Sequence, residues 1–139
     1  MVRLILSVLG GLLVAFAIVF AADALFHALS STTTPSPDPS DKEAMRTYVA
    51  SQPFAVLAGL IAAWAAAVLT GAALAARSAR RGEWPGWLVT AFFILGTAAN
   101  FLMVTHPTWM VLAATGSILL GGWLGSRIGA TARQPAPAV

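Results

Sequence analysis

Four apolar segments, each close to the length needed to cross a bilayer, constrain this chain more than any other feature. They cover residues 4–26, 54–76, 87–104 and 109–124. A hydrocarbon core about 30 Å thick requires roughly 20 helical residues at about 1.5 Å each. The last two segments are shorter and are joined by His106-Pro107-Thr108. We therefore expect an antiparallel pair in which Pro107 ends the third helix and Thr108 caps the fourth.

The composition agrees with a membrane protein. Of 139 residues, 58% are hydrophobic and 9% are charged, whereas soluble domains carry about 25% charged residues. A water-soluble fold of this size could not cover its own core. Taken over the whole chain, the composition excludes a soluble enzyme, a sequence that is itself only a disordered tail, and a free nucleic-acid-binding module. It predicts an all-α membrane protein: one four-transmembrane-helix bundle over residues 1–129, with a disordered cytoplasmic tail at 130–139.

The distribution of basic residues predicts the orientation, because Lys and Arg are retained on the cytoplasmic side. If both termini are cytoplasmic, Lys42 and Arg46 are the only basic residues that would lie outside. The basic residues that would lie inside are Arg3, Arg77, Arg80, Arg81, Arg127 and Arg133. This bias indicates a multi-pass protein with its N-terminus inside.

The first segment has a second interpretation. Arg3, the apolar run and the triplet Ala22-Asp23-Ala24 resemble a signal peptide with its cleavage site. Cleavage would leave three spans. We favour retention, because the apolar stretch is longer than the usual ~7–15 residues of a signal peptide.

The loop of residues 28–52 changes character along its length. It begins with Ser, Thr and Pro, which favour an extended chain. Ser40 and Glu43 then have the spacing of a capping box, which predicts an external amphipathic helix of about ten residues. One face of that helix would carry Met45, Tyr48 and Val49. It is either a docking surface for another protein or a plug over the outer ends of the bundle.

Small residues recur every fourth position in the second and fourth segments. They are Gly59, Ala63, Ala67, Gly71 and Ala75, and Ala113, Ser117, Gly121, Gly125 and Gly129. This pattern lets helix backbones approach closely in lipid. We expect it to build the bundle within one chain, the alternative being a seam between copies. Trp64, at mid-span, is expected to pack between helices.

Polar side chains gather at the predicted outer end. Asp23 and His27 are an i, i+4 pair, and Asn100 and His106 lie at the same end of the third segment. An ionisable residue in a span suggests a functional site, so these four form a possible polar or proton site. Asp23, His27 and His106 could also be ligands of a zinc-type metal site. A purely structural role, tying the first helix to the turn at 106–108, is favoured over both.

Catalytic motifs are missing from the sequence. It contains no G-x-x-x-x-G-K-[ST], no G-x-S-x-G and no H-E-x-x-H pattern. The hydroxyl residues within the segments are predicted to form hydrogen bonds between helices. They are Ser7, Thr70, Thr90, Thr97 and Ser117. We therefore expect neither an enzyme nor a cofactor.

Several short motifs together resemble a group of small four-span bacterial inner-membrane proteins with no assigned activity. They are Asp23 with His27, Pro37-Asp38-Pro39, the basic stretch at residues 77–81, Asn100, and His106-Pro107 before Trp109. The resemblance implies four spans and a location in a bacterial inner membrane. It implies nothing about mechanism.

Three functions compete. The favoured one is a non-enzymatic structural, accessory or assembly subunit that acts through helix packing, in contact with lipid and with a homo-oligomer or larger membrane complex. The second is a small oligomeric transporter or ion or proton channel, a class that places its ionisable site near the membrane midplane. The third is an outer-face metal-binding protein.

Overall fold

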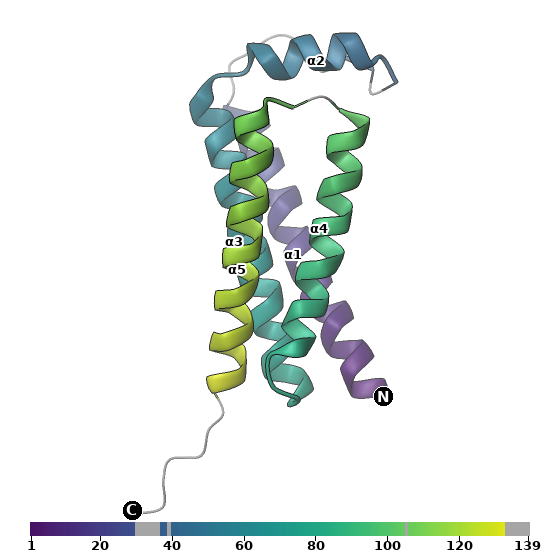
Figure 1. Ribbon diagram of the computed structural model, residues 1–139, viewed down its shortest axis with the longest axis vertical. Coiled ribbons are helices and arrows are strands. Elements are labelled where there is room, and N and C mark those ends of the chain that lie inside the picture. The colour runs from purple at the N-terminus through teal and green to yellow at the C-terminus, as the bar shows by residue number, and fades with distance from the viewer. Residues whose placement is uncertain (30–36, 39, 105, 133–139) are drawn as a thin grey trace, which may run out of the picture.

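A computed structural model describes residues 1–29, 37–38, 40–104 and 106–132, without the side chains of His27 and Leu29. Within these residues all regular structure is helical. The helices are α1 (Val2–Leu29), α2 (Lys42–Ser51), α3 (Phe54–Ala79), α4 (Trp84–Met103) and α5 (Thr108–Thr131). The four long helices run along the bundle and α2 lies across one end of it (Figure 1). All four are long and apolar enough to span a membrane, as predicted for a multi-pass membrane protein.

The long helices extend beyond the apolar segments at the end opposite α2. Helix α3 continues to Ala79 and α5 continues to Thr131. Hydropathy falls at the arginines, but Arg and Ala are both good helix formers, so the backbone hydrogen bonds continue. Helix α3 stops where Arg80 takes a left-handed φ of 55°. The tail predicted from residue 130 therefore begins as helix, and residues 133–139 lie outside the described residues.

The turn between α4 and α5 differs from the prediction that Thr108 caps the fourth helix. Thr108 is the first helical residue, and Pro107 occupies the cap position without a side-chain hydrogen bond. The Pro107 carbonyl accepts hydrogen bonds from the amides of Met110 at 2.9 Å and Val111 at 3.2 Å. Proline can precede a helix in this way because its fixed φ suits the cap, so the Thr108 prediction was wrong.

The capping box predicted at Ser40 and Glu43 is also wrong, although the ten-residue helix is present. Asp41 is the N-cap of α2, and its carboxylate accepts a hydrogen bond from the Ala44 amide at 3.0 Å. Ser40 instead donates from its amide and its hydroxyl to Asp38, at 2.9 and 2.8 Å. Because Asp38 engages Ser40 in a turn, the helix starts one residue later than predicted.

Helix α2 packs against the end of the bundle through its apolar side. Val49 is buried in one cluster with Leu57 of α3 and Met110 of α5, and Tyr48 packs against that cluster. The opposite side of α2 is exposed and polar, including Lys42. The helix therefore lies across the bundle end with Val49 against the bundle (Figure 1).

Glycines of α5 bring that helix against the backbone of α3. A Cβ added at Gly121 would lie 2.7 Å from the Ala65 carbonyl oxygen. The pairs along the seam are Gly121 with Ala65, Gly125 with Leu69, and Gly129 with Ala73. The other predicted members of the stripe do not lie in this close seam: Ala113 is exposed and Ser117 is half-buried.

The small residues of α3 face α1. Gly71 and Gly11 are in backbone contact, and a Cβ at Gly59 would lie 2.5 Å from the ring of Phe26. Ala67 is buried and Ala63 is half-buried. The two faces of α3 thus hold α1 and α5 within a single chain.

Trp64 lies between helices, as predicted. Its ring is 6.3 Å from that of Phe101 on α4, and it packs against the core clusters.

Candidate functional site

Four of the five hydroxyls that were predicted to bond between helices bond instead to the backbone of their own helix. Thr90 and Thr70 donate to the carbonyls four residues earlier, at 3.0 and 2.8 Å. Ser7 and Ser117 also bond within their own helices. In a helix, the carbonyl oxygen three or four residues earlier lies within reach of a Ser or Thr hydroxyl, and it is the acceptor in each of these bonds.

His106 lies half-buried in the turn between α4 and α5. Its Nδ1 is 2.7 Å from the Val104 carbonyl oxygen, and its ring meets Phe101 edge-on at 5.0 Å. Because a carbonyl can only accept, Nδ1 carries the proton and donates. This contact stabilises the turn and leaves Nε2 as the nitrogen not used in the hydrogen bond.

The other predicted polar residues come from two helices. Asp23 is exposed on α1 and Asn100 is exposed on α4. The His27 side chain lies outside the described residues. In the described part of the chain, no three His, Cys, Asp or Glu residues are grouped so that they could hold a metal ion.

A groove opens between α1, α3 and α4, and we call it the aromatic groove. Its volume is about 220 Å³. It is lined by Phe16, Val19, Trp64, Phe92, Phe93, Gly96, Thr97 and Asn100. The rings of Phe16 and Phe93 lie 5.7 Å apart across it. The lining is apolar except for Thr97 and Asn100, which are three residues apart on α4, and for the Trp64 indole nitrogen.

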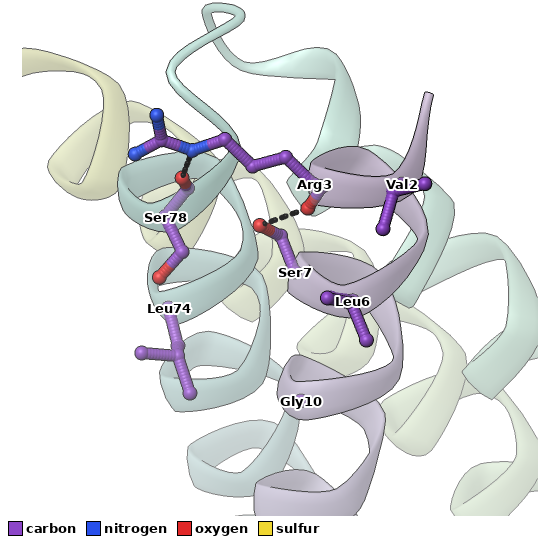
Figure 2. A pocket seen from close by; sticks show the side chains of 7 residues that line it. All are labelled: Val2, Arg3, Leu6, Ser7, Gly10, Leu74 and Ser78. Atoms are coloured by element: carbon purple, nitrogen blue, oxygen red, sulfur yellow. Dashed lines mark hydrogen bonds between the residues drawn. The ribbon is translucent and has the colours of Figure 1, made fainter.

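A second groove, the Arg3 groove, lies between α1 and α3 (Figure 2) near the N-terminus, at the opposite end of the bundle from α2 (Figure 1). Its volume is about 570 Å³. The α1 side carries Val2, Arg3, Leu6, Ser7 and Gly10, and the α3 side carries Leu74 and Ser78. In the sequence, Arg3 indicated the orientation and formed part of the signal-peptide resemblance, and no pattern pointed to this groove.

Charge separates along the bundle. The described residues at the end opposite α2, here called the arginine end, carry Arg3, Arg77, Arg80, Arg81 and Arg127 against one acid, Glu83. Glu83 lies 3.6 Å from Arg127, whose guanidinium is 5.0 Å from the Trp123 ring. Both partners of this ion pair are substantially exposed, so it adds little stability. The described charges at the α2 end are Asp23, Asp38, Asp41 and Glu43 against Lys42 and Arg46.

The interior offers little polarity. Among the described residues the buried polar side chains are Ser7, Thr90 and Ser126, and none of them is ionisable. Ser126 is fully buried, and its Oγ has no hydrogen-bond partner in that part of the chain. It sits against Gly86, at the arginine end of α4.

Comparisons with known proteins do not place the chain in a family. No protein-family model, no curated protein and no solved structure matches it.

Proposed function

We propose that the protein is a non-enzymatic accessory or assembly subunit that binds a transmembrane helix of a larger membrane protein. The observation that carries this proposal is the aromatic groove, where the side of the bundle is incompletely filled. Asn100 lines the groove, and so does Thr97, which lies about one turn earlier on α4. A partner helix would fill the groove and meet both polar groups.

Polarity at the groove supports a protein partner. Asn and Thr commonly form hydrogen bonds between membrane helices. Asn100 is exposed, so its amide is accessible to a second helix. Saturated acyl chains could fill the apolar part of the groove, but they have no donor or acceptor for this amide.

The interior favours this function over transport. Transporters place substrate and ion sites near the membrane midplane and build them from polar or ionisable groups. The buried polar side chains of the described residues are hydroxyls, and two of them donate within their own helices. A route through the monomer therefore has no support, whereas a lateral binding face does.

The proposal includes an orientation and a location. The arginine end faces the cytoplasm and α2 lies outside, in a bacterial inner membrane. The support is the separation of five arginines from the acid-rich α2 end, as expected from the retention of basic residues inside.

Site-specific photo-crosslinking in native membranes tests the proposed function. A photoreactive residue at Phe92, in the groove, should link to one defined polypeptide, and the same residue at exposed Leu120 on α5 should not. Asn100→Leu should reduce the Phe92 cross-link. Adducts with lipid alone, or with a second copy of the chain, would contradict the proposal. So would a proton or cation flux in liposomes that Asp23→Asn abolishes, which would instead support transport.

A further inference from the structure

The Arg3 groove is a cleft with apolar walls and a cationic rim. Leu6 of α1 is 63% exposed and Leu74 of α3 is 37% exposed, and both side chains line the groove in Figure 2. Arg3 crosses from α1 to α3 at the rim. The groove thus combines a hydrocarbon-like surface with one positive charge at its end.

Two adjacent glycines of α1 differ in their surroundings at this groove. Gly11 holds α1 against α3, because a Cβ there would lie 2.5 Å from the Gly71 carbonyl oxygen. At Gly10 an added Cβ would meet nothing within 4 Å. The helices are therefore in contact beside Gly11 and leave open space over Gly10, where an extended hydrocarbon chain has room to lie.

The guanidinium of Arg3 is held in place before any ligand arrives. Its Nε donates to the Ser78 carbonyl oxygen at 2.9 Å, and this bond does not involve the two terminal amino groups of the guanidinium. Those groups point away from Ser78 (Figure 2). A guanidinium binds phosphate through paired hydrogen bonds, and one that is already fixed loses less entropy on binding.

The surrounding charge favours an anion. The arginine end carries five arginines and one acid among its described residues, and that acid, Glu83, lies beside Arg127 rather than Arg3. Basic pockets between membrane helices attract anionic lipid headgroups. The apolar walls then select an anion that is attached to an acyl chain.

We propose that the Arg3 groove binds an anionic phospholipid. The headgroup phosphate accepts hydrogen bonds from the Arg3 guanidinium, and one acyl chain lies over Gly10 between Leu6 and Leu74. This site shares no lining residue with the aromatic groove, although α1 and α3 contribute to both, and it lies nearer the arginine end. It therefore does not depend on the proposed function.

Native mass spectrometry of the full chain in mild detergent tests the proposal, with phosphatidylglycerol as the probe and phosphatidylcholine of the same chain length as the neutral comparison. Phosphatidylglycerol should bind more tightly. Arg3→Gln should weaken its binding about tenfold, as expected for loss of a hydrogen bond to a charged group. Arg81→Gln, which removes the same charge outside the groove, should weaken it much less.

A second pair of variants tests the acyl chain. Gly10→Leu would place a side chain in the open space of the groove and should lower phosphatidylglycerol binding. Gly116→Leu adds the same side chain on α5, where a Cβ likewise meets nothing within 4 Å, and should leave binding unchanged. Thermal melting without added lipid shows whether each variant is folded.

Three results would overturn the proposal. Equal binding of the two lipids would remove the role of the anionic charge. Equal losses of phosphatidylglycerol binding in Arg3→Gln and Arg81→Gln would mean that the lipid is attracted by the overall charge of the arginine end and not by Arg3. Unchanged binding in Gly10→Leu would place the acyl chain elsewhere.

Discussion

Gly11 of α1 and Gly71 of α3 meet backbone to backbone: a Cβ built on either residue would lie 2.5 Å from the carbonyl oxygen of the other. No real Cβ is tolerated at that distance from a carbonyl. The contact needs a hydrogen atom on both sides, so both positions require glycine if the two helices are to keep their separation.

Alanine at either position should therefore destabilise the bundle. For Gly11→Ala and Gly71→Ala we expect a loss of about 1–3 kcal/mol in unfolding free energy, which is the usual cost of overpacking. Reversible unfolding by SDS in mixed micelles measures it. Gly10→Ala is the control, since its Cβ meets no neighbour, and it should be neutral or stabilising by up to about 1 kcal/mol. Equal effects at residues 10 and 11 would contradict the close contact.

Replacing Ser126 should cost nothing. Its hydroxyl is buried without a hydrogen-bond partner in the described residues, and such a group carries a desolvation penalty of about 1–3 kcal/mol. Ser126→Ala should leave the melting temperature unchanged or raise it. The comparison is Thr90→Val, which removes a hydroxyl that does donate, to the Gly86 carbonyl. A clear loss of stability in Ser126→Ala would reveal a partner such as a buried water.

Substituting Asp41 and Ser40 one at a time tests which of them caps α2. Asp41→Ala removes the N-cap and should destabilise the helix by about 1 kcal/mol. The Ala44 amide, which donates to Asp41, should then exchange with solvent about fivefold faster. Ser40→Ala should leave that exchange nearly unchanged, because Ser40 bonds to Asp38 instead. Faster exchange of the Ala44 amide in Ser40→Ala than in Asp41→Ala would indicate that Ser40 is the cap.

The carboxyl of Asp38 should titrate below its ordinary value. The amide and the hydroxyl of Ser40 both donate to it and lower its pKa from 3.8. The pKa is depressed in the folded state, so the stabilisation is complete above about pH 3.8 and is lost as the pH falls through the lowered pKa. Ser40→Ala should raise the Asp38 pKa only partway, since the amide hydrogen bond remains. Carboxyl carbon shifts followed by NMR would measure both values; an unchanged pKa in Ser40→Ala would contradict a role for the hydroxyl.

His106→Ala should lower the stability of the protein by the same amount with and without zinc. His106→Ala removes the hydrogen bond to Val104 and the contact with Phe101, at a cost of about 1–2 kcal/mol. Melting in chelator and in zinc should show the same difference from the unmodified protein. A stabilisation by zinc that appears only when His106 is present would instead support the metal hypothesis.

The spans were predictable because hydropathy determines which segments can cross a membrane. The ends of the helices were harder to predict. Arg77 and Arg127 lower the hydropathy, yet helical hydrogen bonding continues past both. Caps depend on local competition for acceptors. The Ser40 hydroxyl donates to the Asp38 carboxylate, and the spacing of Ser40 and Glu43 in the sequence does not show this.

The sites were harder to predict because they depend on how helices are rotated against each other. Gly10 and Gly11 are adjacent and chemically identical, yet one is packed and the other open. Asn100 was recognised as polar, but its groove also needs Phe16 and Trp64 from two other helices. The sequence pattern predicted small-residue packing and could not assign each face to a neighbour.

The seam between α3 and α5 is periodic, and this creates a choice of register. Its glycines and the carbonyls they meet both recur every four residues, so a slide of about one turn, or ~5.4 Å, would re-form two of the three pairs. Val49 of α2 shares a buried cluster with Leu57 and Met110, and that cluster would be broken by the slide. The glycine seam alone therefore does not specify the register of α3 and α5, and the buried cluster of Val49, Leu57 and Met110 contributes to it.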